Sequence, residues 1–175
     1  MASKLRVDSI LPVDGAPTGG GGGIIQVVHS STATLMQQTT IDTDYDTNLS
    51  ATITPKFNTS KILIMVSQMC SIRSTVAGTF AMQLSLVRTP SGGSSVIIID
   101  GDNGATSMGN FTGRANTPTS YNSMTAMQPL HILDEPATTT ALTYKTTALL
   151  TTSNSTMKLQ EDGVKSYMTL MEVSA

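Results

Sequence analysis

The sequence predicts an all-β protein, a two-layer sandwich of antiparallel strands. Three observations support this class. Threonine, serine, valine and isoleucine dominate the segments, and branched side chains of this kind favour a pleated strand. Glycine, asparagine, aspartate and proline separate those segments at short intervals, as turn residues do. The 175 residues, 39% of them hydrophobic, are enough for one sizeable core, so we expect one domain.

Residues 1–23 differ in composition from the rest of the chain. A short extended piece carries Leu5, Val7 and Ile10 at alternating positions, and prolines and a run of five glycines at 19–23 follow it. Glycine runs behave as flexible linkers. We therefore predict an N-terminal arm on a hinge over residues 1–23 and a sandwich domain over residues 24–175.

The first strands are expected at residues 24–29, 49–54 and 61–72. Residues 35–38 offer a short helical turn at most, because threonine and serine flank them. In the 61–72 segment both alternating sets of side chains are apolar, whereas a sheet with one wet face alternates apolar with polar residues. This pattern predicts that both faces of that strand are covered.

The later strands show clearer alternation. Residues 79–88 place Phe80, Met82, Leu84 and Leu86 on one side. Residues 140–150 alternate in the same way, and further strands are expected at 94–100, 124–133, 157–159 and 167–173. About nine or ten strands without crossover helices predict an antiparallel jelly-roll β-sandwich.

The chain is also expected to associate with itself. The last strand, residues 167–173, is apolar on both faces, and eleven methionines indicate adaptable apolar surface that subunit contacts usually cover. We predict a homotrimer with Ile64, Met168 and Leu170 in its interface.

Charge and motifs argue against several other functions. The formal net charge of -2 gives no basic field for nucleic acid or an anionic membrane surface. A single cysteine, Cys70, inside an apolar run predicts a buried, unpaired thiol. His29 and His131 stand outside any catalytic motif, so no enzyme and no cofactor are expected. The acidic set at Asp42, Asp44 and Asp46 lacks the glycine and glutamate of a calcium loop, so no metal site is predicted.

One segment is polar and long enough to contact a receptor. Residues 105–122 are rich in glycine, asparagine, threonine and serine and contain Phe111, Arg114 and Tyr121. Such a loop is a candidate contact for host surface glycans, and the alternative is a loop that only connects strands.

Several segments resemble tail-fibre-like virion proteins of bacteriophages, particularly those of marine and cyanobacterial phages. The similar segments are residues 3–10, 22–28, 53–64, 133–145 and 168–173, which are distributed over most of the length of the chain. The resemblance implies a trimeric jelly roll whose N-terminal arm docks onto the particle, and it carries over no catalytic residue.

Two functions remain open at this stage. One is a capsid decoration (cement) or head-fibre protein that grips the major capsid protein, or a tail or fibre attachment protein, through Leu5, Val7 and Ile10. The other is a tail-fibre module that recognises host glycans. Both imply a protein made in the host cytoplasm and located on the virion surface.

Overall fold

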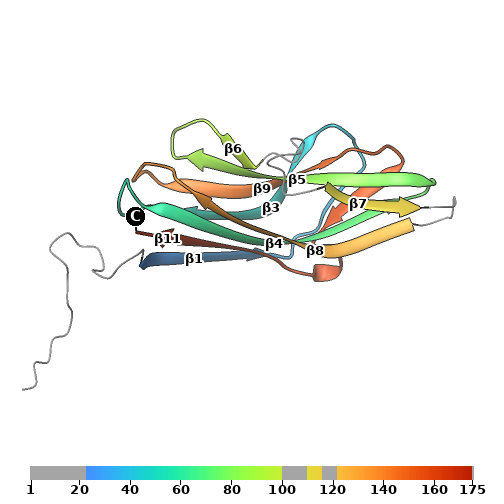
Figure 1. Ribbon diagram of the computed structural model, residues 1–175. Coiled ribbons are helices and arrows are strands. Elements are labelled where there is room, and N and C mark those ends of the chain that lie inside the picture. Colours follow the sequence, from blue (N-terminus) through green and yellow to red (C-terminus); the bar gives the residue numbers. More distant parts are fainter. Residues whose placement is uncertain (1–22, 100–109, 116–121, 175) are drawn as a thin grey trace, which may run out of the picture.

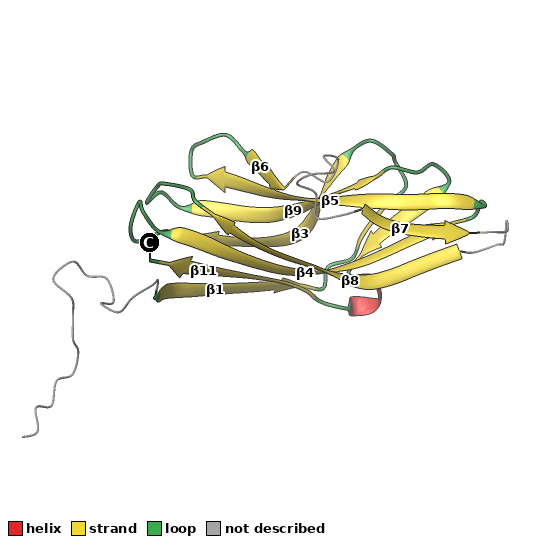
Figure 2. Ribbon diagram, in the orientation of Figure 1, coloured by secondary structure: helices red, strands yellow, loops and turns green. Residues whose placement is uncertain are grey.

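Two antiparallel sheets packed face to face form the body of the protein (Figure 1). The computed structural model describes residues 23–99, 110–115 and 122–174. Within these residues the secondary structure is almost entirely strand, with one 3-10 turn, η1, at Glu161–Gly163 (Figure 2). The structure thus confirms the all-β prediction and the two-layer arrangement. None of the described helical structure is long or apolar enough to cross a bilayer.

The first sheet, called sheet A here, is built around the long strand β4. Strand β4 pairs with β8 along one side and with β11 and then β10 along the other. Strand β1 pairs with β11, and the short β2 pairs with β10. The bounds of the strands are β1 (Ile24–Thr32), β2 (Met36–Gln38), β4 (Lys61–Ser74), β8 (Asn122–Asp134), β10 (Ser155–Leu159) and β11 (Ser166–Val173).

The second sheet, sheet B, follows the same plan around β5. Strand β9 pairs with β5 on one side and with β3 on its own far side. The other side of β5 pairs first with β7 and then with β6. The bounds are β3 (Asp44–Ile53), β5 (Gly78–Pro90), β6 (Val96–Ile99), β7 (Asn110–Ala115) and β9 (Leu142–Leu150).

The hydrophobic core lies between the two sheets. The alternation predicted for residues 79–88 is confirmed, because Phe80, Met82, Leu84 and Leu86 are all buried. Strand β9, the neighbour of β5 in sheet B, contributes the buried side chains of Leu142, Tyr144, Ala148 and Leu150. Because successive strand residues point to opposite faces, each of these strands gives one set of side chains to the core and the other to the outside.

A polar chain crosses this core and joins the two sheets. Gln68 on β4 donates a hydrogen bond to the Ser166 hydroxyl on β11 at 3.0 Å and accepts one from the Thr146 hydroxyl on β9 at 3.0 Å. Thr146 is in turn hydrogen-bonded to Thr47 on β3. All four side chains are fully buried, and their hydrogen bonds offset the cost of removing them from water.

Two elements differ from the sequence prediction. The 35–38 segment is not a helical turn, because Met36–Gln38 is the strand β2, held by its pairing with β10. Residues 110–115, expected in a loop, form the strand β7 beside β5. Local sequence disfavours both strands, so their pairing partners decide the conformation.

Candidate interaction surface

The side of sheet A that faces away from the core carries a regular grid of twelve side chains, which we call the outer A face. Cross-strand register aligns three rows over β1, β11, β4 and β8. Residues directly opposite each other on neighbouring strands project from the same face of a sheet. The rows are Val27, Met171, Leu63 and Leu133; then His29, Thr169, Met65 and His131; then Ser31, Tyr167, Ser67 and Pro129.

The outer A face is accessible in the single chain. All twelve side chains are partly or fully exposed, and Val27, Leu133 and Tyr167 are 54%, 48% and 41% exposed. The first row is aliphatic or thioether across all four strands. His29 stacks on Tyr167 with ring centroids 5.9 Å apart and is hydrogen-bonded to the Thr169 hydroxyl at 3.0 Å.

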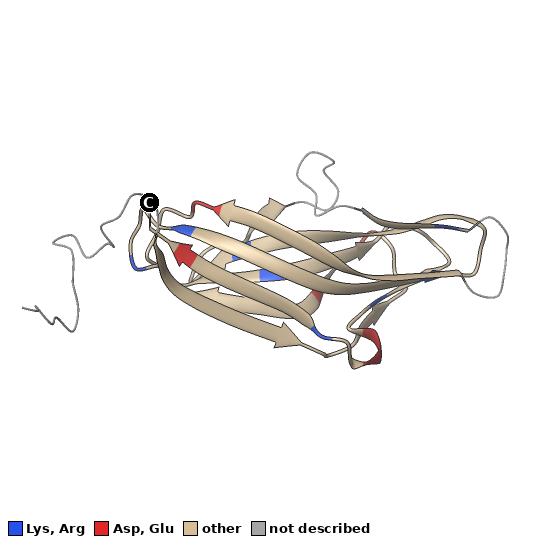
Figure 3. Ribbon diagram, turned by 60° about the horizontal axis from the view of Figure 1, so that its bottom comes forward, with Lys and Arg blue, Asp and Glu red and all other residues tan. Residues whose placement is uncertain are grey.

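Formal charge is absent from this grid. None of its twelve residues is Asp, Glu, Lys or Arg. In Figure 3, which turns sheet A towards the reader, the charged positions of this sheet lie near the ends of its strands. The ion pair between Lys61 and Glu135, 2.6 Å apart, stands at one end of the grid. An uncharged, largely apolar surface of this kind can bury against another apolar surface without leaving an unpaired charge.

The three predicted interface residues do not lie on this surface. Ile64, Met168 and Leu170 are fully buried in the core between the sheets, so no partner chain can reach their side chains. The interface prediction is therefore wrong for these three residues. Their neighbours Leu63, Thr169 and Met171 occupy the opposite face of the same strands.

The pattern that misled the prediction is the same in both strands. Strands β4 and β11 are apolar at both alternating sets, so the sequence does not say which set faces the core. The expectation that both faces of the 61–72 strand are covered is confirmed for residues 68–72, which are all buried, and is wrong for the first half of the strand. Ile62, Ile64 and Val66 are buried, whereas Leu63 and Met65 remain partly exposed.

The residues predicted as a receptor contact are separated by the structure. Phe111 on β7 is buried against the core, so it cannot contact a receptor. Arg114 is exposed on the same strand. Tyr121 lies outside the described residues, as do the arm residues Leu5, Val7 and Ile10.

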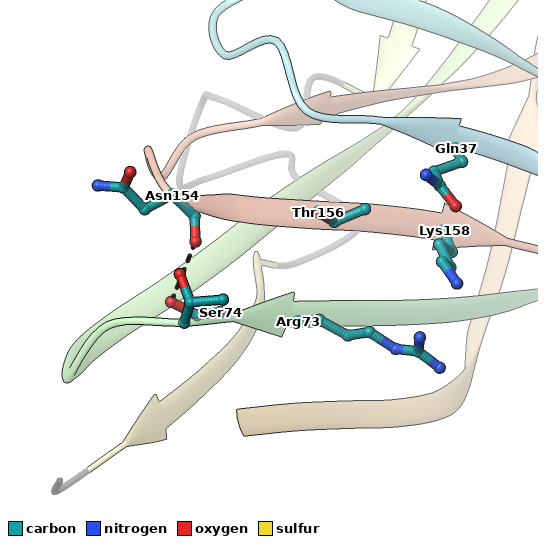
Figure 4. A pocket seen from close by; sticks show the side chains of 7 residues that line it. Gln37, Arg73, Ser74, Asn154, Thr156 and Lys158 are labelled. Carbon is teal, nitrogen blue, oxygen red and sulfur yellow. Dashed lines mark hydrogen bonds between the residues drawn. The ribbon is translucent and has the colours of Figure 1, made fainter. Parts of the chain in front are cut away.

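A polar pocket of about 230 Å³ opens at the other end of sheet A, between β2, β4 and β10 (Figure 4). Its lining is hydrophilic throughout and comprises Gln37, Arg73, Ser74, Thr75, Asn154, Thr156 and Lys158. Both cations form ion pairs with Glu161, and the Lys158 ammonium lies 2.8 Å from the carboxylate. Burial raises the pKa of the Glu161 carboxyl, but hydrogen bonds from Lys158 and Ser71 and the charge of Arg73 outweigh burial, and the pKa is lowered.

Cys70 is buried and unpaired, as predicted, and burial raises the pKa of its thiol to about 12, which keeps it in the unreactive thiol form. Among the described residues, His, Cys, Asp and Glu form no group of three that could hold a metal ion.

The described part of the chain belongs to the broad class of antiparallel β-sandwich proteins. No protein-family model and no curated protein sequence matched the chain. Solved structures similar to it include infectious bursal disease virus, Gx strain, at 9% identity and a TM-score of 0.38 over 97% of this chain and 44% of that chain. T=1 particles derived from the same virus match at 9% identity and a TM-score of 0.40, over 97% and 42%.

A mutant VP2 protein of that virus in T=1 particles matches at 11% identity and a TM-score of 0.37, over 96% of this chain and 40% of that chain. The chain thus spans less than half the length of these neighbours. Similarity this low identifies neither a family nor a shared function, so the proposals below are based on the residues of this chain.

Proposed function

We propose that this protein is a structural protein of a bacteriophage virion, a trimeric capsid decoration (cement) or head-fibre protein that its N-terminal arm attaches to the particle. The resemblance of five sequence segments to phage tail-fibre-like proteins suggests the kind of particle. The observation that carries a structural role is the outer A face, an uncharged and exposed sheet surface suited to contact with other protein subunits.

The proposal includes a jelly-roll fold for the sandwich. A jelly roll has eight strands in two sheets connected as two Greek keys. The strand order β1-β11-β4-β8 in sheet A and β3-β9-β5-β7 in sheet B supports this assignment. Consecutive strands along the chain, such as β3 and β4, lie in different sheets, as this connectivity requires.

The root of the arm lies at one end of sheet A. The Gly23 N–H donates a hydrogen bond to the Ser174 hydroxyl at 2.9 Å, and the Gly23 carbonyl accepts one from the Ser174 N–H at 3.0 Å. The described part of the chain therefore begins at the end of β11. An extended arm starting here can add to an exposed sheet edge of a capsid subunit, with Leu5, Val7 and Ile10 as alternate anchors.

Binding to particles stripped of this protein tests the attachment. The full chain carrying Leu5→Asp, Val7→Asp and Ile10→Asp is compared with a control carrying Ser3→Asp, Ser9→Asp and Thr18→Asp. Both variants add three carboxylates to the arm, but only the first removes apolar anchors. We expect co-sedimentation with particles to be lost for the first variant and retained for the control. Equal binding of both variants would contradict the proposal.

The polar pocket of Figure 4 favours a second candidate, a tail-fibre module that recognises host surface glycans. Its amide, hydroxyl and cationic side chains are hydrogen-bonding partners for a polyhydroxylated ligand. Binding of the arm variant to host cells separates the two functions. Cell binding that survives the arm substitutions but is lost in Asn154→Ala would favour this second candidate.

A further inference from the structure

We propose that the outer A face is the surface on which a second copy of this chain packs. The inference deepens the proposed function, which includes self-association, by naming the residues that make the contact. The row Val27, Met171, Leu63 and Leu133 supplies the apolar contacts, and Tyr167 supplies an aromatic anchor four residues away along β11. Aromatic residues and methionine are enriched in protein interfaces.

The two outer faces of the sandwich differ in a way that selects sheet A. The outside of sheet B carries Asp44, Asp46, Ser50 and Thr52 on β3, and Thr143 and Lys145 on the neighbouring β9. The Lys145 ammonium pairs with the Asp46 carboxylate at 2.9 Å. This is the polar outer face usual for an antiparallel sheet in water. The outer A face lacks that polarity. Its two central strands, β4 and β11, each place a separate, fully buried set of side chains in the core.

Charge decides between the candidate occupants. In a contact between two copies of the chain, a formal charge that is buried without an opposite partner opposes self-association. The outer A face has none among its twelve residues, and Lys61 and Glu135 at its end neutralise each other. Nucleic acid or an anionic lipid surface would need clustered cations, which the grid does not offer. A second copy of this chain therefore fits better than a strongly charged partner.

The size of the grid suits the centre of such a contact. Four strands about 4.8 Å apart and three rows spanning about 20 Å give a flat area of roughly 400 Å². That is about half of the ~800 Å² that each partner contributes to a stable interface of standard size. Interfaces combine an apolar centre with a polar rim. Lys61, Glu135 and the serines of the third row are placed to supply such a rim.

Sedimentation equilibrium of the full chain over a range of concentrations tests the inference. The interface variant Val27→Glu/Leu133→Glu is compared with Val96→Glu/Ile97→Glu. The control replaces a valine and an isoleucine on β6 of sheet B, which are 45% and 55% exposed. We expect wild type and control to associate alike, and the interface variant to associate more than ~100-fold more weakly, because unpaired carboxylates resist burial.

Circular dichroism and thermal unfolding establish that each variant is folded. Should the glutamates prevent folding, Val27→Ser/Leu133→Ser and Val96→Ser/Ile97→Ser provide a milder pair with the same expected order. A monomeric wild type, or equal association of the matched variants, would overturn the inference. So would association that the Leu5, Val7 and Ile10 substitutions abolish and the Val27 and Leu133 substitutions leave unchanged, because the arm would then hold the copies together.

Failure of this inference can be told apart from failure of the proposed function. A wild-type protein that binds stripped particles as a monomer would contradict the outer A contact and leave the virion role standing. A protein that associates through the outer A face but never binds particles would contradict the virion role alone.

Discussion

Arg88 on β5 and Asp134 on β8 join the two sheets through a salt bridge. The Arg88 Nη1 group donates to both carboxylate oxygens of Asp134, at 2.8 and 2.7 Å. The Tyr144 hydroxyl on β9 donates to the same carboxylate at 2.6 Å. Burial, together with the neighbouring Asp134 carboxylate, raises the pKa of Tyr144, so this hydroxyl keeps its proton and remains a donor.

Removing the charge of Arg88 should destabilise the fold. We expect Arg88→Met to lower the free energy of unfolding by about 2–4 kcal/mol, because it leaves the largely buried Asp134 carboxylate without its cation. Lys61→Met is the control, since it removes an exposed pair with Glu135 and should cost at most about 1 kcal/mol. Urea denaturation measures both. Equal losses of unfolding free energy in the two variants would show that the inter-sheet ion pair stabilises the fold no more than the exposed pair does.

Acid should weaken the fold through Glu172, whose side chain is fully buried on β11. Burial raises the pKa of this carboxyl. The Ser60 hydroxyl, the Gln26 amide and the backbone N–H groups of Lys56 and Phe57 lower it by more than burial raises it, so the pKa lies below its ordinary value of 4.5. A group whose pKa is lowered by folding stabilises above its unfolded pKa, and this contribution is lost as pH falls through the folded pKa.

The free energy of unfolding should therefore fall as pH drops below about 4.5. Glu172→Gln should be less stable than wild type at neutral pH, and the difference should shrink in acid as the wild-type carboxyl becomes protonated. Chemical denaturation at a series of pH values measures this convergence. A constant difference between the two proteins at every pH would contradict it.

Gly113 on β7 is required by its neighbour Phe80 on β5. A Cβ atom at this position would collide with the Phe80 ring. We expect Gly113→Ala to cost about 1–3 kcal/mol in thermal or urea unfolding, as overpacking of a core does. The double variant Gly113→Ala/Phe80→Leu should show a smaller loss than the sum of its two single variants. Strict additivity would indicate that the ring and the added methyl do not meet.

Cys70 should resist modification while the protein is folded. Its side chain is fully buried, and burial raises the pKa of the thiol to about 12. Thiol reagents attack the thiolate, so the native protein should react with a chromogenic disulfide at pH 8 only as fast as it unfolds. Denatured protein should react at once. Rapid reaction of the native protein would show that the core around β4 opens readily.

Local patterns were sufficient to predict most of the strands. Alternation placed the core-facing sets of β5 and β9 correctly, because each strand has one apolar and one polar set. Strand β7 was missed because its sequence, with Asn110, Gly113 and Arg114, contains turn residues and no run of branched side chains. Its extended conformation depends on hydrogen bonds to β5, a partner about thirty residues earlier in the chain.

The candidate surface was only half predictable. The sequence indicated surplus apolar character in β4 and β11, but it pointed to Ile64, Met168 and Leu170 as interface residues. Leu63 and Met171 on the outer A face meet only through the register between β11 and β4. No short-range sequence pattern specifies how β11 aligns with β4.

By itself, the sequence determined the all-β class, the sites of most strands and the inward set of each strand that alternates between apolar and polar residues. Only the tertiary structure decided which face of the doubly apolar strands β4 and β11 became the core, because a period of two fixes alternation but not its phase. Packing against sheet B buried Ile62, Ile64 and Val66 and left Leu63 and Met65 outside. It also brought Arg88 to Asp134, 46 residues away, where the pair links the two layers.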